Sequence, residues 1–187
     1  MTINDAVILI KERLNSSAKA LTVAIDGRCA SGKTTFAALI EQFSDCNVIH
    51  LDDFFLQPEQ RTSQRLDTPG GNFDKERFID EVITGINSGS GFTYHRFDCS
   101  TMKLGEEIYV KPKPLTIIEG SYSCHPDLSR NWDMKFFVTT DKITQKERIE
   151  KRNPDKAEMF FSKWIPLEEK YFEHFRIEEN SDYIIKT

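Results

Sequence analysis

The chain has 187 residues, a length that favours one domain with a full hydrophobic core. Its residues are 39% hydrophobic and 29% charged, and no apolar run approaches the roughly 18 residues that a membrane span requires. The formal net charge of −5 argues against broad contact with nucleic acid, which needs a basic face to neutralise phosphates. We therefore expect a globular protein in which a local positive site holds any bound anion.

The start of the chain and the cysteines indicate an intracellular setting. Asp5 and Glu12 near the N-terminus fit neither a secretory signal nor a transit peptide, so we expect a cytoplasmic location. Cys124 and His125 have no partners at zinc-ligand spacing. No CxxC pair occurs either, which predicts reduced thiols for Cys29, Cys46, Cys99 and Cys124.

The first part of the chain has the pattern of a strand-helix-strand unit. An amphipathic helix is predicted first, because Ile3, Val7, Ile10 and Leu14 recur at helical spacing. The apolar runs 21–26 (LTVAID) and 47–51 (NVIHL) are typical of buried parallel strands. Between them, a second helix is predicted, with one apolar face made of Phe36, Ala37, Ile40 and Phe43.

The rest of the chain continues this alternation. The polar, turn-rich segment 62–74 leads into a helix with apolar positions between 78 and 86. Glycines around and within the segment 92–110 indicate short strands joined by turns. Strands separated by helices predict a three-layer α/β domain with a mainly parallel sheet. The further predicted strands are 115–120, 134–140 and 182–187, and the further helices are 142–152 and 166–175.

The segment Gly27–Thr34 (GRCASGKT) satisfies the pattern GxxxxGK[ST], and it lies between a predicted strand and a predicted helix. In such a loop the backbone N–H groups point at phosphate oxygens, the lysine reaches the β and γ phosphates, and the hydroxyl of Thr34 can bind Mg²⁺. This motif supplies the local positive site, but it leaves kinase, GTPase, ATPase and sensor open. The predicted nucleotide-binding residues are Gly27, Arg28, Cys29, Ala30, Ser31, Gly32, Lys33, Thr34 and Thr35.

Three acids follow predicted strands directly. Asp52 and Asp53 end the second strand, and Glu119 ends the run LTII. Ligands of open parallel sheets bind beyond the carboxyl ends of the strands, so these acids are expected to meet the phosphates and a Mg²⁺ held by Thr34, Asp52 and Glu119. Successive strand residues face opposite ways, so only one of the adjacent pair can act as the base. The alternative is that the acids are solvated strand ends or caps of a turn.

On these motifs the chain resembles the uridine kinase and nicotinamide riboside kinase group of P-loop kinases. The similar segments are GRCASGKTT, LDDFF, NFDKERF, IIEG, KERIEKR and WIPLEEKYFEHF. The resemblance implies a P-loop NTPase fold with a helical lid at approximately 145–165, and ATP and Mg²⁺ as cofactors. It also implies Asp52 as the catalytic base, Glu119 as a metal-associated acid, Asp74 as the carboxylate that grips ribose hydroxyls, and Arg148 and Arg152 as lid arginines that act with Lys33 on the phosphates.

For two of these implied roles, the sequence itself also supports an alternative interpretation. Asp74 begins a predicted helix, where aspartate is favoured as an N-cap, and it could serve as ligand, cap or both. Arg148 and Arg152 stand four residues apart on one helical face, as a charge clamp on a triphosphate requires. However, Glu147 and Lys151 form an i,i+4 pair, which is also typical of a solvated charged face.

The chain departs from the uridine kinase pattern where the base would be recognised. A tyrosine and a histidine are expected after the middle strands, but Phe97 and Asp98 stand at the similar place and no histidine follows. This puts uridine itself in doubt. Arg96, with Tyr94 and His95, could instead belong to a different acceptor pocket. His50 is interpreted as a structural histidine.

The resulting prediction is an ATP-dependent phosphotransferase that acts on a hydroxyl of a nucleoside-like or riboside metabolite. The alternatives are a kinase of a non-nucleoside alcohol such as pantothenate or a sugar, and a nucleotide-dependent switch or sensor. No NKxD segment occurs, which weakens guanine specificity. The expected partner is one small-molecule acceptor, with neither nucleic acid nor membrane. The sequence leaves open whether the chain forms a homo-oligomer.

Overall fold

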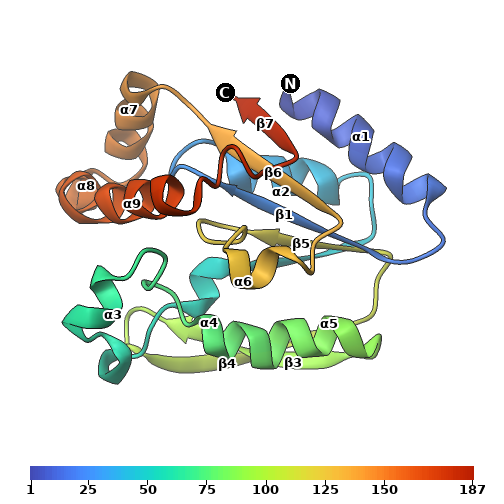
Figure 1. Ribbon diagram of the computed structural model, residues 1–187, viewed down its shortest axis with the longest axis horizontal. Coiled ribbons are helices and arrows are strands. Elements are labelled where there is room, and N and C mark those ends of the chain that lie inside the picture. The colour runs from blue at the N-terminus through green and yellow to red at the C-terminus, as the bar shows by residue number, and fades with distance from the viewer.

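A sheet of five parallel strands forms the centre of the computed structural model, which describes all residues, 1–187 (Figure 1). Every neighbouring pair runs parallel, and the order is β2-β5-β1-β6-β7. All five predicted strands are present, which confirms the mainly parallel α/β architecture. Their bounds are Leu21–Gly27 for β1, Cys46–His50 for β2, Leu115–Glu119 for β5, Met134–Thr139 for β6 and Tyr183–Lys186 for β7.

Two helices cover one face of this sheet. The first is α1 (Ile3–Ser16), which begins at a capping box between Thr2 and Asp5, and the second is α2 (Lys33–Glu41). Their apolar residues pack on alternate residues of the strands, because successive strand side chains point to opposite faces. The resulting core includes Ala6, Ile10, Phe36, Ala37 and Ile40 from the helices and Val23, Ile25, Ile117, Phe136 and Val138 from the sheet.

A second core lies on the other face. One helical stretch there runs through α4 (Lys75–Phe78), a π turn (Ile79–Ile83) and α5 (Thr84–Ser88), where the sequence predicted a single helix. The shorter α3 (Ser63–Asp67) and α6 (Pro126–Ser129) and the long α9 (Ile165–Phe175) complete this side. The core is rich in aromatic side chains, including Phe54, Phe73, Phe78, Tyr122, Phe137, Tyr171 and Phe172.

The segment 92–110 forms one antiparallel hairpin that lies apart from the main sheet. Strands joined by turns were predicted here, but the turn at 99–102 contains no glycine and Gly105 lies within a strand. The strands of the hairpin are β3 (Phe92–Asp98) and β4 (Lys103–Val110), and the pairing shifts register between His95 and Phe97. Such a bulge re-aims nearby side chains. The turn of this hairpin becomes important for the acceptor side of the site described below.

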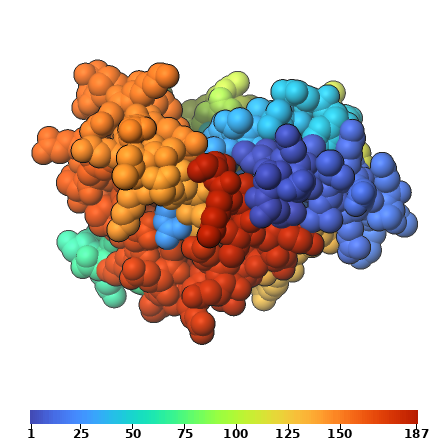
Figure 2. Space-filling model, turned by 90° about the horizontal axis from the view of Figure 1, so that it is seen from above, coloured from blue at the N-terminus to red at the C-terminus, as the bar shows by residue number.

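The predicted lid is a run of short helices between β6 and α9. It contains α7 (Lys142–Arg152), a 3-10 turn (Pro154–Lys156), α8 (Ala157–Met159) and a π turn (Phe160–Trp164). The helix α7 ends just before Pro154, which cannot continue it. Figure 2 shows β7, in red, between the orange lid segment and the blue α1. None of the helices is both long and apolar enough to cross a lipid bilayer.

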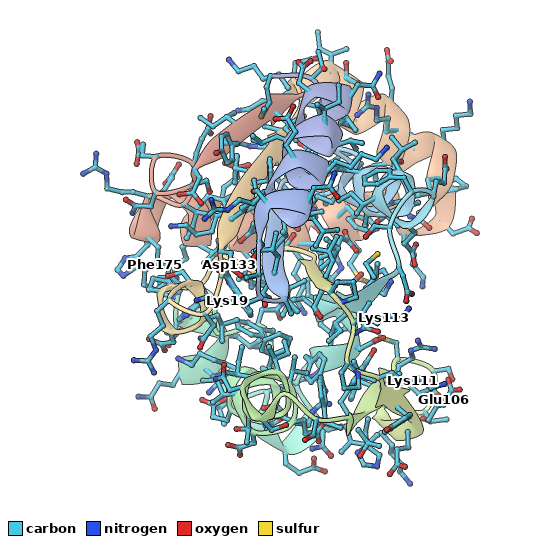
Figure 3. The ribbon with its side chains drawn as sticks, turned by 90° about the vertical axis from the view of Figure 1, so that its right-hand side faces the viewer. Lys19, Glu106, Lys111, Lys113, Asp133 and Phe175 are labelled. Carbon is cyan, nitrogen blue, oxygen red and sulfur yellow. The ribbon has the colours of Figure 1, made fainter.

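The two edges of the sheet differ in what they carry. The edge in Figure 3 holds residues that precede strands, among them Lys19 before β1, Lys113 before β5 and Asp133 before β6. The GxxxxGK[ST] loop and the predicted acids follow strands β1, β2 and β5, so they gather at the opposite edge.

Candidate active site

The loop Gly27–Thr34 joins β1 to α2 and is shaped by its glycines. Gly27 has φ +136°, and a Cβ atom there would lie 1.9 Å from the carbonyl oxygen of Val138 on β6. Only glycine allows the loop to leave the sheet this close to the neighbouring strand. Gly32 takes the left-handed conformation at the N-cap of α2, which begins at Lys33. The strand-loop-helix arrangement that the motif requires is therefore present.

Lys33 is folded over the loop. Its ammonium nitrogen donates to the carbonyl oxygens of Gly27 at 2.7 Å and Arg28 at 3.0 Å, and the residue is 8% exposed. Carbonyl oxygens carry only partial charge, so phosphate oxygens would be stronger acceptors for this lysine. The loop thus holds its cation in place where phosphates would reach it.

Lys33→Ala is expected to abolish the rise in melting temperature that Mg-ATP causes, because the variant lacks the cation for the β and γ phosphates. The check is a thermal melt with and without Mg-ATP. Lys146→Ala provides a matched control, since Lys146 is exposed on the lid helix α7 and pairs only with Glu150 at 3.8 Å. A Mg-ATP shift that stays the same in Lys33→Ala would contradict the phosphate-binding role.

Glu119 brings three segments together at the end of β5. One of its oxygens accepts a hydrogen bond from the Thr34 hydroxyl at 3.2 Å, and the other lies 2.7 Å from Nδ1 of His50. This contact with Glu119 raises the pKa of His50. Sequence reasoning had treated His50 as structural and missed the contact, although His50 ends the strand that precedes the acids.

The chemistry of Thr34, Glu119 and the nearby Asp52 fits magnesium. No group of three or more His, Cys, Asp or Glu side chains could hold a metal alone. Mg²⁺ prefers oxygen ligands and is usually held by one or two carboxylates together with water and substrate phosphates. A hydroxyl and a carboxylate in contact beside the loop between β1 and α2 are such a donor set.

Asp52 and Asp53 have different surroundings because a 3-10 turn (Leu51–Phe54), not the strand, carries them. Asp53 is buried, and its carboxylate accepts from the Tyr94 hydroxyl and from Arg96 Nε, both at 3.0 Å. Asp52 is open to solvent and makes no hydrogen bond through its side chain. Even so, the protein around it desolvates its carboxyl group and raises the pKa, and the Glu119 carboxylate adds to the rise. Of the two acids, Asp52 is the one left free.

Asp74 is 2% exposed and caps α4, as one of the two sequence interpretations expected. Its carboxylate accepts from the backbone N–H of Arg77 at 3.1 Å and from Gln60 Nε2 at 2.9 Å. The cap is therefore observed. A contact with ribose hydroxyls would have to share the second oxygen, so that role stays a prediction.

The residues predicted at the hairpin are held by acids. Arg96 pairs with Glu106 at 3.2 Å as well as with Asp53. His95 is half-buried and lies 3.8 Å from Glu81 and 3.7 Å from Glu107. Arg96 thus contacts the acid next to Asp52, whereas His95 belongs to a solvated charged surface.

The helix α7 of the predicted lid touches the loop between β1 and α2. Arg148 donates to the carbonyl oxygen of Ala30 at 3.2 Å and to the Thr187 hydroxyl at 2.9 Å. Gln145 on the same helix donates to the Cys29 carbonyl at 3.0 Å. Arg152 on the same helix is exposed and makes no hydrogen bond or ion pair with the loop. The structure therefore brings Arg148 to the loop, whereas the phosphate contact of Arg152 stays a prediction.

Several solved structures of similar fold are described as kinases. A possible uridine kinase from Bacillus stearothermophilus matches with a TM-score of 0.73 at 18% identity, over 99% of this chain and 100% of that one. A D-glycerate 3-kinase from Cryptococcus neoformans var. grubii gives 0.63 at 12% identity, over 98% and 95%. A phosphoribulokinase from Rhodobacter spheroides gives 0.60 at 11% identity, over 91% and 71%.

This chain has the P-loop kinase fold. No protein-family profile and no curated protein sequence matches it. The identities to the solved structures are low, so the likeness shows the fold, and the chemistry has to be argued from the site.

The structure also shows a buried carboxylate directly before the P-loop motif, whose contacts sequence reasoning missed. Asp26, the last residue before Gly27, is fully buried and accepts four hydrogen bonds. Three come from the backbone N–H groups of Gly27, Tyr122 and Cys124, and the fourth from the Tyr171 hydroxyl of α9 at 2.8 Å. Burial raises the pKa of Asp26 to about 6, although these donors favour the ionised form. A carboxylate at the end of an apolar strand was the available sequence signal.

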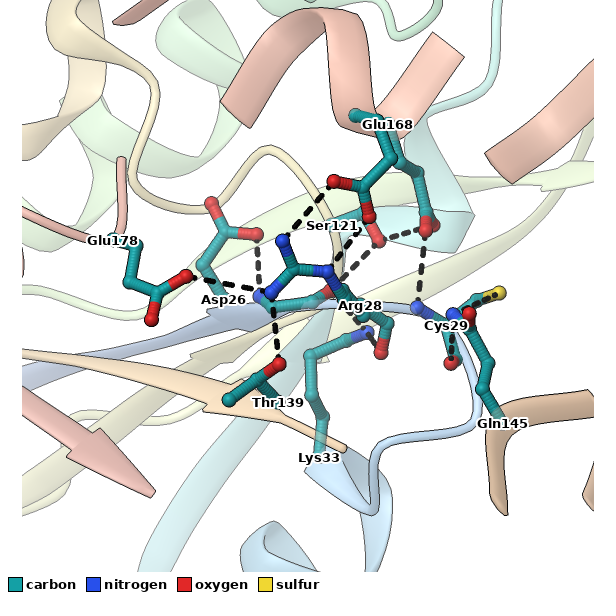
Figure 4. Close-up of polar contacts among 11 residues, drawn as sticks. Asp26, Arg28, Cys29, Lys33, Ser121, Thr139, Gln145, Glu168 and Glu178 are labelled. Atoms are coloured by element: carbon teal, nitrogen blue, oxygen red, sulfur yellow. Dashed lines mark hydrogen bonds and ion pairs between the residues drawn. The ribbon is translucent and has the colours of Figure 1, made fainter. Parts of the chain in front are cut away.

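Two more residues of α9 reach the same loop. Glu168 is 8% exposed and accepts from the Cys29 backbone N–H at 3.0 Å and from the Ser121 hydroxyl at 2.6 Å (Figure 4). Glu169 forms a bidentate pair with Arg28, at 2.7 and 3.0 Å. We call Glu168, Glu169 and Tyr171 together the α9 anchor. The anchor engages the guanidinium of Arg28, so Arg28 contributes to the loop through its backbone.

Proposed function

We propose that this chain is an ATP- and magnesium-dependent kinase of a small metabolite with a free hydroxyl group. The supporting observation is the meeting of three separate segments at one edge of the sheet. There, Lys33 lies in a P-loop, Thr34 touches Glu119 at 3.2 Å, and the unpaired Asp52 stands beside them. The fold shared with three described kinases is consistent with this activity.

Each residue has a distinct task in the proposed transfer. The loop N–H groups and Lys33 bind the β and γ phosphates, and Arg148 approaches them from the lid. Asp52 orients the acceptor hydroxyl and accepts its proton as the oxygen bonds to the γ-phosphorus, while the bond to the β,γ-bridging oxygen breaks and ADP leaves. Mg²⁺, which Thr34 and Glu119 would hold, supplies neutralisation of phosphate charge. Most of the rate enhancement then comes from positioning and electrostatic stabilisation.

The acceptor is proposed as a nucleoside-like or riboside metabolite, with Asp74 near its hydroxyls. A non-nucleoside alcohol is the second candidate, and one observation favours it. Arg96, the hairpin residue predicted to contact substrate, is paired with Asp53 and Glu106, and Tyr94 is buried against Phe54 with a 5.3 Å stacking distance. These side chains are engaged within the protein, so they form no ready site for a pyrimidine.

A panel of nucleosides, sugars, hydroxy acids and vitamins incubated with Mg-ATP tests the proposed function. We expect ADP release that depends on one class of acceptor, together with a phosphorylated product detected by mass spectrometry. The same panel with GTP in place of ATP defines the phosphoryl donor. ADP release without any acceptor would instead favour an ATPase or sensor.

A further inference from the structure

Five arginines of the chain are half-buried: Arg28, Arg61, Arg65, Arg77 and Arg148. Three of them pair with carboxylates, since Arg28 contacts Glu169, Arg65 contacts Glu76 and Arg77 contacts Glu81. Arg148 has no acidic partner, and it lies at the P-loop where nucleotide phosphates are proposed. Arg61 is the other half-buried arginine without an acid. Partial burial of a cation is costly unless an anion balances it, which makes Arg61 a candidate for ligand contact.

The Arg61 side chain is fixed in position, but only one of its three guanidinium nitrogens has a hydrogen-bond partner. Its Nε donates to the carbonyl oxygen of Leu56 at 2.9 Å, and its guanidinium carbon lies 5.8 Å from the centre of the Phe97 ring. These two contacts fix the plane of the guanidinium group. Its two terminal nitrogens make no hydrogen bond or ion pair with the protein. A fixed guanidinium with both terminal nitrogens free matches the geometry of a carboxylate or phosphate group.

Both contacts place Arg61 on the acceptor side of the site. Leu56 follows the turn that carries Asp52, and Phe97 lies on β3 just before the hairpin turn. The charges of Asp52 and Arg61 both act on the pKa of the exposed Cys99 in that turn. Burial raises the pKa of its thiol and the negative charge of Asp52 adds to this, while the positive charges of Arg61 and Lys156 lower it. Arg61 therefore lies between the hairpin and the segment that carries the proposed base.

We propose that Arg61 binds an anionic group of the phosphoryl acceptor, so that the substrate is an alcohol that also carries a carboxylate or a phosphate. The inference rests on the proposed kinase function and adds the substrate class. Such an acceptor would be repelled by Asp52 and by the triphosphate, and the charge of Arg61 would offset that repulsion at the anionic group of the acceptor. Neutral nucleosides lack the group that this arginine would bind.

Matched acceptor pairs test the inference by kinetics. The pairs are D-glycerate with glycerol, and ribose 5-phosphate with ribose, with uridine as a neutral nucleoside. We expect transfer to a charged member, with kcat/KM reduced roughly 10- to 100-fold by Arg61→Gln, chiefly through KM. Arg13→Gln is the control, because Arg13 is exposed on α1 and has no acidic partner. Transfer to glycerol, ribose or uridine that Arg61→Gln leaves unchanged overturns the inference.

If no acceptor is phosphorylated, the proposed function fails and a binding measurement decides the inference. Cys99 is exposed and the other three cysteines are buried, so iodoacetamide should modify Cys99 first. With Mg-ADP present to fill the P-loop, D-glycerate or inorganic phosphate should slow this alkylation in the wild type and leave it unchanged in Arg61→Gln. Glycerol is the neutral control. Protection of Cys99 by D-glycerate indicates that Arg61 binds a carboxylate, and protection by inorganic phosphate indicates that it binds a phosphate. Equal alkylation rates with and without both anions overturn the inference.

Discussion

Asp52→Asn is expected to lower kcat for phosphoryl transfer by roughly 10²- to 10⁴-fold while Mg-ATP affinity changes by no more than a few-fold. Asparagine has nearly the same shape as aspartate but cannot accept the proton of the attacking hydroxyl. Asp52 is suited to that task because its carboxylate is open to solvent and unpaired where β2 ends. The measurements are kcat with the best acceptor of the panel and a Kd for Mg-ATP from thermal shift or calorimetry.

The pH dependence of the rate gives a second test of the same residue. Desolvation and the Glu119 carboxylate raise the pKa of Asp52, and only the ionised form can act as a base. Activity should therefore rise with pH through the raised pKa and then level off, with its acid limb above the roughly 3.9 of an ordinary aspartate. The acid limb that reports Asp52 should be absent from the residual activity of Asp52→Asn.

Asp53→Asn is the matched control, since it changes the adjacent carboxylate in the same way. Asp53 holds Tyr94 and Arg96 at 3.0 Å, so its loss should loosen the hairpin and lower stability. It should leave proton acceptance intact. If Asp52→Asn retained more than a tenth of the wild-type kcat while Asp53→Asn lost most of it, the roles of the two acids would be reversed.

The sequence predicted the parts of this molecule that depend on local pattern. The apolar runs of β1 and β5 identified buried parallel strands, because both faces of such strands pack against helices. The loop Gly27–Thr34 could be identified because its glycines and lysine have fixed spacing. Alternation along a strand also led to the expectation that Asp52 and Asp53 diverge. They do diverge, but on a 3-10 turn, which the apolar residues around the acids did not reveal.

The contacts that depend on distant segments could not be predicted in this way. Tyr171 meets Asp26 across 145 positions, and Glu168 meets Cys29 across 139. In the sequence, Glu168 belongs to a charged stretch typical of a solvated helix face. Only the packing of α9 against the loop shows that its carboxylate is buried. Arg61 was missed for the same reason, since nothing local marks an arginine that lacks a partner.

The second large effect is expected at Asp26, directly before the P-loop. Asp26→Ala should lower the free energy of unfolding by about 3–5 kcal/mol, because it leaves four buried donors without their acceptor. Asp26→Asn should cost less, since its amide oxygen can still accept from Gly27 and Tyr122 while its NH₂ group faces the Cys124 N–H. Tyr171→Phe removes only one donor and should cost about 1 kcal/mol. The measurement is the free energy of unfolding of each variant from denaturant titration, compared among variants that share the same m-value.

The functional consequence separates a P-loop role from general stability. Asp26 bonds the first N–H of the loop at Gly27, so its variants should bind Mg-ATP more weakly even where they remain fully folded. Asp133→Ala is the control at the other end of β1, where Asp133 accepts from the Thr22 N–H at 2.8 Å. That variant should lose stability and keep its nucleotide affinity. If both variants bound Mg-ATP as the wild type does, Asp26 would serve the core alone, and the α9 anchor would not position the loop.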